Sequence, residues 1–322
     1  MNRKDETVEA GNILLVEPGG FGGIAQYARC LAAGLAAEGE AVRMLTAEGS
    51  EDFPKASGVG IEKGMEPPPP PGGGILRRAS NLFLNLRRQG AVVRAAARTG
   101  ARVVHFQSLV FPRRDGALFR RLRGSGARIA LTLHEIASHE PVPAEERLLA
   151  RAYGAVDVFI AHSRADSEAM HSRFGIPPER ISIVPCGHFG FFADVDDGMD
   201  ARAALGAADG GPLLLFFGSL RPYKGIKVLL DAFPAVLREV PAARLAVVFT
   251  DEREPSEPHR ARAAALGSAG IPVDPARIAI AVEDVLIVRG GIGVGAEAER
   301  AANERMRQPT FTVTVDLGLG PA

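Results

Sequence analysis

Short apolar runs alternate with longer amphipathic stretches along most of this chain. Runs of five to seven residues are typical of buried parallel strands, and the amphipathic stretches between them are typical of helices that cover a sheet. We expect strands at 12–17, 41–46, 102–107, 128–134, 156–162 and 181–185, with helices at 24–38, about 75–99, 113–124, 143–154 and 163–174. A second series follows, with strands at 212–219 and 244–251 and a helix at 226–239. The pattern predicts an α/β fold of doubly wound, Rossmann-like sheets.

Two segments interrupt the pattern. The stretch from Phe191 to Gly211 holds five aspartates and no long apolar run, so we interpret it as a connector between domains. The sequence EPPPPPGGG at 66–74 is expected to form an exposed, mobile loop, because proline lacks the backbone donor that helices and sheets need. A length of 322 residues fits two domains, which we assign to 1–195 and 196–322.

Composition excludes several classes of protein. Thirty-eight basic residues balance 38 acidic ones, so no overall positive field draws the chain to nucleic acid or anionic lipid. The two cysteines are 156 positions apart and form no CxxC pair, which argues against a disulfide framework or a structural zinc site. The N-terminus shows no signal-peptide pattern, and the longest stretch without Asp, Glu, Lys or Arg is 13 residues. We expect a cytoplasmic protein.

A glycine-rich turn follows the first predicted strand. It contains Gly20, Gly22 and Gly23 and leads directly into the first helix, so backbone N–H groups lie at the carboxyl edge of the sheet. The segment also matches the dinucleotide fingerprint GxGxxA, but the acid expected at the tip of the second strand, Glu48, comes two residues late. A tight turn, a nicotinamide or flavin site and a substrate-binding loop all remain open, and we favour the last.

His134 ends the fourth predicted strand. His134 and His139 are five residues apart, whereas a zincin helix spaces its histidines by four, so we reject a metalloprotease interpretation. A histidine at the carboxyl end of a parallel strand faces the ligand crevice. We therefore favour His134 as a ligand contact over a structural histidine.

The most specific motif is FFGSLRPYKGIK at 216–227. Gly218 ends a strand, Arg221 and Lys224 lie in the turn after it, and Gly225 opens the next helix. Two cations and a helix N-terminus that converge can neutralise a diphosphate without a divalent metal. A solvated charged turn is the alternative.

Four segments carry a family resemblance, in this order: GGFGGIAQY, LTLHE, FGIPPERISIVPCG and FFGSLRPYKG. They resemble retaining glycosyltransferases of family 4 with the GT-B fold, in particular the bacterial branch that carries RPYKG. The resemblance covers residues 12 to about 250. It implies transfer of a hexose from a nucleotide diphosphate sugar to a cell-envelope, polysaccharide or lipid-linked acceptor, with no metal and no other cofactor. Arg221 and Lys224 would stabilise the leaving diphosphate, Gly22 and Gly23 would lie against the reacting sugar, and His134 would touch its hydroxyls.

The resemblance stops near Glu252. The family's E-x7-E glutamate pair is missing, and the nearest candidates, Glu297 and Glu304, miss the spacing by one. The tail could still form a strand at 282–291 and a glycine turn around Gly291, Gly293 and Gly295. Either the second domain is incomplete, through a shortened or shifted reading, or it is divergent but works. An inactive or binding-only remnant therefore stays an alternative, and an NAD(P)-dependent oxidoreductase is a more distant one.

Arginines cluster at two places in the first domain. One cluster is Arg113, Arg114, Arg120, Arg121 and Arg123, and the other follows the helix at 75–99. The resemblance implies that such surfaces approach anionic lipids, so a peripheral contact with the inner face of the cytoplasmic membrane is one expectation and a solvated helix face is the other. No aromatic residues alternate with the arginines, so nucleic acid is not an expected partner.

Overall fold

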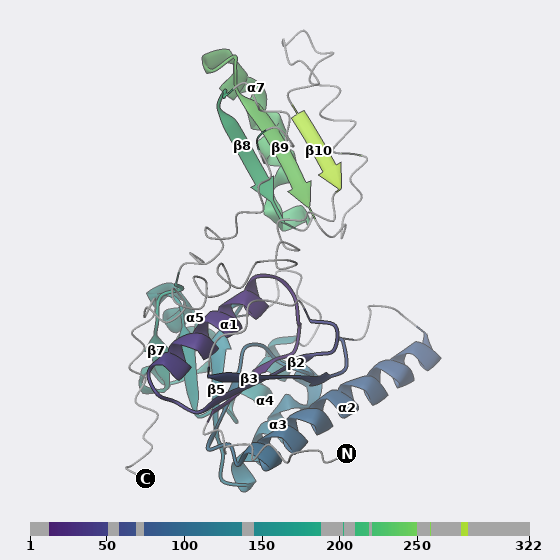
Figure 1. The fold of residues 1–322 in the computed structure, drawn as a ribbon, viewed down its shortest axis with the longest axis vertical. Coiled ribbons are helices and arrows are strands. Elements are labelled where there is room, and N and C mark those ends of the chain that lie inside the picture. Colours follow the sequence, from purple (N-terminus) through teal and green to yellow (C-terminus); the bar gives the residue numbers. More distant parts are fainter. Residues whose placement is uncertain are drawn as a thin grey trace, which may run out of the picture. The chain divides into compact units, whose positions relative to one another are not determined.

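The computed structural model describes residues 13–50, 58–68, 74–136, 145–187, 210–218, 221–249 and 278–282, together with residues 202 and 258. These residues form two compact units, one holding the described residues up to 187 and the other those from 202 onward (Figure 1). Each unit is built on a parallel β-sheet. The domain boundary at residue 195 and the connector around it lie outside the described residues and stay predictions.

The first unit contains a sheet of seven described strands. In chain order they are β1 (Ile13–Glu17), β2 (Val42–Ala47), β3 (Val59–Met65), β4 (Val103–Phe106), β5 (Arg128–Leu133), β6 (Val158–Ala161) and β7 (Ile181–Ile183). Their order across the sheet is β3-β2-β1-β4-β5-β6-β7, and all neighbours are parallel. The order reverses between β1 and β4, and such a switch point opens a crevice at the carboxyl ends of the strands. The predicted doubly wound sheet is confirmed.

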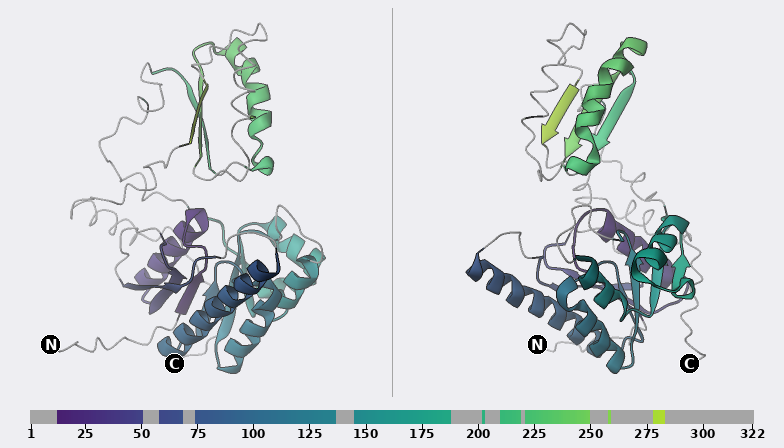
Figure 2. Two further views of the ribbon diagram at one scale, coloured as in Figure 1. Left: turned by 90° about the vertical axis from the view of Figure 1, so that its right-hand side faces the viewer. Right: turned by 180° about the vertical axis from the view of Figure 1, so that it is seen from behind.

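Helices cover both faces of this sheet (Figure 2). They are α1 (Gly22–Ala37), α2 (Ile75–Thr99), α3 (Pro112–Gly124), α4 (Glu145–Tyr153) and α5 (Arg164–Phe174), with a short 3-10 helix η1 (Pro178–Arg180) before β7. On one face, Leu15 of β1 packs with Tyr27 and Leu31 of α1. On the other, Val16 packs in a larger core that includes Phe119 of α3. Successive β1 residues thus serve opposite cores, which explains why the whole strand is apolar up to Glu17.

One strand of the first unit was not predicted. β3 pairs with β2 at the edge of the sheet, and most of its residues are half-buried. Its sequence, VGIEKGM, mixes glycines and charges with apolar residues, because an edge strand needs no continuous apolar run. The proline loop that follows falls largely outside the described residues.

The second unit holds β8 (Leu213–Phe217), β9 (Arg244–Phe249) and β10 (Ile278–Val282) in the order β10-β9-β8, all parallel. A 3-10 helix η3 (Pro222–Lys224) leads into α7 (Ile226–Glu239), whose Leu230 and Phe233 are fully buried against the sheet. β8, β9 and α7 match the prediction. β10 ends at Val282, and apart from that residue the strand predicted at 282–291 lies outside the described residues.

Cys30 is buried and Cys186 exposed, and both are free thiols. In the described part of the chain, no helix is long and apolar enough to cross a membrane.

Candidate functional site

The glycine turn lies between β1 and α1, as predicted. Gly20 and Gly22 have φ angles of +82° and +73°, which side chains other than glycine rarely adopt. A side chain at Gly20 would also meet the Cβ of Ala47 at 3.1 Å, whereas the positions of Gly22 and Gly23 face open space. Phe21 provides no side-chain cap for α1, and the first turn of α1 carries no acidic residue. The turn therefore exposes backbone and the positive end of a helix dipole at the carboxyl edge of the sheet.

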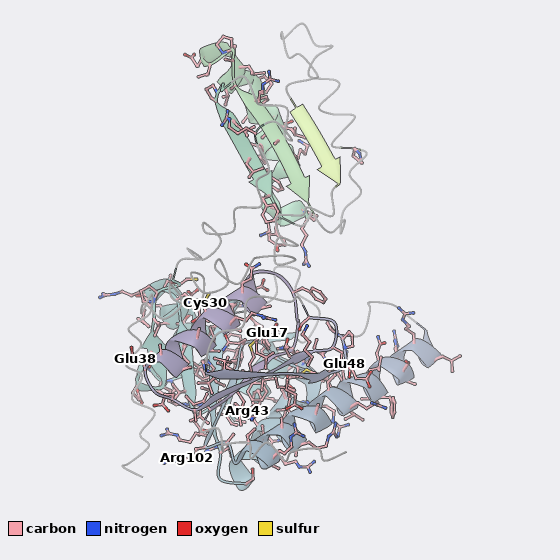
Figure 3. The ribbon with its side chains drawn as sticks, in the orientation of Figure 1. Glu17, Cys30, Glu38, Arg43, Glu48 and Arg102 are labelled. Carbon is pink, nitrogen blue, oxygen red and sulfur yellow. The ribbon has the colours of Figure 1, made fainter. Side chains whose placement is uncertain are left out.

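Hydrogen bonds to the side chain of Glu17 fix the position of this turn. Its carboxylate is 1% exposed and accepts hydrogen bonds from the backbone N–H groups of Gly19 at 2.8 Å and Gly20 at 2.7 Å. The hydroxyl of Thr46, at the end of β2, donates a third bond at 3.0 Å. Figure 3 shows Glu17 inside the first unit, unlike the exposed Glu48. Sequence reasoning missed Glu17, although an acid that closes an apolar strand just before a glycine turn was a visible signal.

A second buried link ties α2 to the same turn. The guanidinium of Arg88 is buried and donates to the backbone carbonyl of Pro18 at 2.6 Å. Burial lowers the pKa of Arg88, while the charges of Asp115 and Glu17 act against that shift. Asp115 accepts bonds from Gln89 at 2.8 Å and from the N–H of Phe111 at 2.8 Å. These long-range pairs could not be read from the sequence.

His134 lies directly after β5, in an aromatic cluster. Its ring centroid is 4.8 Å from that of Tyr27 on α1 and 5.2 Å from that of His162, which follows β6. Its Nε2 lies 3.3 Å from the side-chain Oε1 of Gln107, the residue after β4. Beneath it, buried His105 on β4 is hydrogen-bonded to Thr132 at 2.8 Å. His134 therefore lies at the same edge of the sheet as the glycine turn.

Burial keeps His134 and His105 neutral. Desolvation, assisted by His162, lowers the pKa of His134 from 6.5 to about 4. Desolvation, assisted by His134, lowers the pKa of His105 to about 3. At neutral pH, His134 can accept or donate hydrogen bonds but carries no charge, so it suits contact with hydroxyl groups better than with phosphates.

The remaining predicted residues lie in the second unit. Gly218 follows β8 and has φ +135°, and Gly225, with φ +76°, is the N-cap residue of α7. Half-buried Arg221 precedes η3 and exposed Lys224 ends it, with the Lys224 Nζ 5.3 Å from the ring centroid of Tyr223. Lys227, the second residue of α7, is ion-paired with Asp231 at 2.9 Å.

The structure thus brings the predicted residues together in two sets, one on each unit. Gly20, Gly22, Gly23 and His134 share one sheet edge, and Gly218, Arg221, Lys224 and Gly225 share one strand-to-helix turn. Among the described residues, no three His, Cys, Asp or Glu side chains are grouped as metal ligands.

Two solved structures illustrate the similarity of this fold to known proteins. Sucrose-phosphate synthase from Thermosynechococcus elongatus matches with a TM-score of 0.57 at 18% identity, over 90% of this chain and 79% of that one. Anabaena HepE, solved in complex with UDP-glucose, matches with a TM-score of 0.57 at 16% identity, over 87% and 70%. These likenesses define the class of the fold: an α/β protein of the GT-B type.

The sequence profile of Glycosyltransferase Family 4 matches residues 21–188, more than half of the chain. The chain belongs to this family. The D-inositol 3-phosphate glycosyltransferase of Segniliparus rotundus is 32% identical over 93 residues, 29% of this chain and 20% of that protein. The arginine biosynthesis bifunctional protein ArgJ of Syntrophotalea carbinolica is 47% identical over 57 residues, 18% of this chain and 14% of that protein. The chain therefore spans one fifth or less of the length of these two curated relatives.

Proposed function

We propose that this protein transfers a hexose from a nucleotide diphosphate sugar, with retention of configuration, to a glycan or lipid-linked acceptor. It would belong to the bacterial branch of the family that carries RPYKG. The observation that carries the proposal is the shared sheet edge in the first unit, where an open glycine turn lies near a neutral histidine in a chain of Glycosyltransferase Family 4.

In this proposal the two units divide the chemistry. The bond between the anomeric carbon of the donor sugar and the diphosphate oxygen breaks, and its electron pair remains on the leaving diphosphate, whose negative charge Arg221 and Lys224 stabilise. The acceptor's hydroxyl oxygen forms the new bond to the anomeric carbon on the same face, and its proton passes to the leaving diphosphate. Gly22 and Gly23 let the main chain approach the sugar closely, because no side chain intervenes. His134, neutral above about pH 5, orients sugar hydroxyls by hydrogen bonds. No cofactor is needed for these steps, and we propose none.

Replacing Lys224 tests the donor site. Lys224→Ala should weaken binding of UDP-glucose or GDP-mannose by about 10- to 100-fold, since a hydrogen bond to a charged group contributes about 1.5–3 kcal/mol. Isothermal titration calorimetry measures the affinity. Lys227→Ala is the matched control, because Lys227 is already paired with Asp231 on the exposed side of α7. Equal losses in both variants, or no loss in Lys224→Ala, would contradict the diphosphate assignment.

Catalysis needs a separate assay. Release of UDP or GDP from the same donors, by transfer or by slow hydrolysis, should accompany binding. Donor binding without any release would favour the binding-only alternative over the enzyme.

A peripheral membrane contact is part of the proposal. α2 carries six arginines and no acidic residue, and Leu76 and Phe83 on its N-terminal half are 88% and 60% exposed. Figures 1 and 2 show this half of α2 extending past the sheet of the first unit. An exposed basic helix with large apolar side chains suits the surface of an anionic bilayer, where a lipid-linked acceptor would be found.

A further inference from the structure

A cavity of about 250 Å³ lies at the carboxyl ends of β4 and β5. Its polar lining residues are Gln107, Ser108, Thr132, His134 and Glu135, and its apolar ones are Ile24, Leu109, Leu131, Leu133, Ile136, Leu149 and Tyr153. Among the described residues, no lysine or arginine lines it, and the one charged lining residue is Glu135. The lining therefore disfavours phosphate or carboxylate groups and favours a neutral ligand with both polar and apolar surface.

Gln107 lines this cavity and has an unfulfilled hydrogen-bond donor. The residue is 0% exposed, and its backbone N–H donates to the carbonyl of Val16 at 2.9 Å, which fixes its place beside β1. Its side-chain Oε1 lies 3.3 Å from His134 Nε2. Its side-chain Nε2 has no hydrogen-bond partner within the described ranges. Buried amide donors in folded proteins almost always have partners, so this one requires an explanation.

The proton on His134 fixes the polarity of the pair. The low pKa of His134 leaves its ring neutral, and an amide oxygen can only accept a hydrogen bond. His134 Nε2 therefore carries the proton and donates it to Gln107 Oε1. The Gln107 NH2 group is then left over as a donor without a described partner.

We propose that the side-chain amide of Gln107 donates a hydrogen bond to a hydroxyl oxygen of a neutral polyol ring, a sugar or a cyclitol, bound in this cavity. The volume is below the roughly 300–1,000 Å³ of pockets for drug-sized ligands and so fits a single ring. Gln107 then determines specificity, because a ring without the matching hydroxyl leaves the buried donor unpaired. The proposal deepens the proposed function. It rests on that function in one respect only, which is that the bound ring is a reactant of the transfer.

The first experiment observes the amide itself. The side-chain ¹⁵N–¹H₂ signal of Gln107 is assigned by its loss in Gln107→Met, and the full-length protein is titrated with glucose, mannose, galactose and myo-inositol. At least one ring should shift this signal in a saturable manner. If all four leave the signal unmoved, the proposal is wrong. The titrated sample is the wild-type protein, so the variant is needed only to assign the signal.

The second experiment tests which hydroxyl is recognised. The ring that binds is compared with its single-deoxy analogues in the wild type and in Gln107→Met. One deoxy analogue should bind the wild type about 10-fold more weakly than the parent ring, and Gln107→Met should bind the two equally. Gln89→Met is the matched control, since Gln89 is also buried but its Nε2 is bonded to Asp115 at 2.8 Å. Gln89→Met should discriminate between the parent ring and its deoxy analogue as the wild type does.

If the deoxy analogue loses the same affinity in Gln107→Met as in the wild type, Gln107 is not the donor to that hydroxyl. Both experiments omit the nucleotide sugar. A failure of the transferase proposal therefore appears as absent donor turnover, and a failure of the Gln107 proposal appears as absent coupling to a ring hydroxyl.

Discussion

At the scale of single residues, burial decides the protonation of the side chains near the cavity. His105 and His134 lose solvation when the first unit folds, so their pKa values fall to about 3 and 4. Asp115 is also desolvated, which raises its pKa to about 6. The two histidines and the aspartate are therefore all biased toward their uncharged forms, but their effects on stability have opposite pH dependence.

The unfolded histidines titrate near pH 6.5, above their folded values, so the unfolded state binds more protons below that pH. Their contribution to stability is full above about pH 6.5 and is lost as the pH falls toward 4. The contribution of Asp115 has the opposite pH dependence between about pH 4 and 6. Its carboxyl group is protonated in the folded state there, so its contribution to stability rises as the pH falls. Two histidines outweigh one aspartate, so we expect the free energy of unfolding to fall on acidification.

Urea denaturation at pH 7, 6 and 5 measures this effect. His105→Gln should reduce the slope of the unfolding free energy against pH by up to about 1.4 kcal/mol per pH unit, the value for one proton. His171→Gln, at an exposed position on α5, should keep the wild-type slope. If the free energy of unfolding of the wild type does not fall between pH 6.5 and 5, the conclusion that these histidines are buried and neutral is wrong.

At the scale of elements, α2 serves two roles along its length. Its N-terminal half is exposed, while farther along Arg88 is buried beneath the glycine turn and Val92 joins the main core. The turn is thus fixed by Glu17 from β1 and by Arg88 from α2, which limits how far its backbone can move toward or away from a ligand.

Replacing Arg88 should reveal this link. Arg88→Met removes the bond to Pro18 and leaves the buried acids Glu17 and Asp115 without their cation, so we expect a loss of about 3–5 kcal/mol in the unfolding free energy of the first unit. Arg87→Met is the neighbouring control, because exposed Arg87 pairs with Glu66 at the surface and should cost no more than about 1 kcal/mol. Chemical denaturation compares the two. Equal losses would refute the buried link.

At the scale of the whole molecule, docking to a membrane would depend on the charge of α2. Arg77 and Arg78 lie on its exposed N-terminal turn, and neither has an acidic partner among the residues that the structure describes. Arg77→Glu with Arg78→Glu should reduce binding to vesicles that contain anionic lipid by at least about 10-fold, since each cation near such a surface contributes about 1 kcal/mol.

Vesicle sedimentation at low and high salt measures this binding, and vesicles of neutral lipid provide the background. Arg98→Glu with Arg102→Glu makes the same change in net charge at the C-terminal end of α2 and just beyond it, and should have the smaller effect. If the two double variants behave alike, overall charge rather than the N-terminal half of α2 governs the contact.

Much of the architecture followed from the sequence because it depends on local pattern. The apolar strands and amphipathic helices of the first unit, and β8, β9 and α7 of the second, form within a few residues of their predicted positions. The glycine turn and His134 were also predictable, since the carboxyl ends of parallel strands meet at one sheet edge. Edge strand β3 was missed because partial exposure leaves it without an apolar run.

The sequence by itself therefore determined the family, the order of the elements and the residues that follow each strand, all of which depend on spacing along the chain. Only the tertiary structure decided that Arg88 reaches Pro18 across 70 residues, and that Gln107 and His134, 27 residues apart, share a hydrogen bond at a cavity. Such pairs arise from packing between distant segments, and burial then sets both their protonation and their unmet hydrogen bonds.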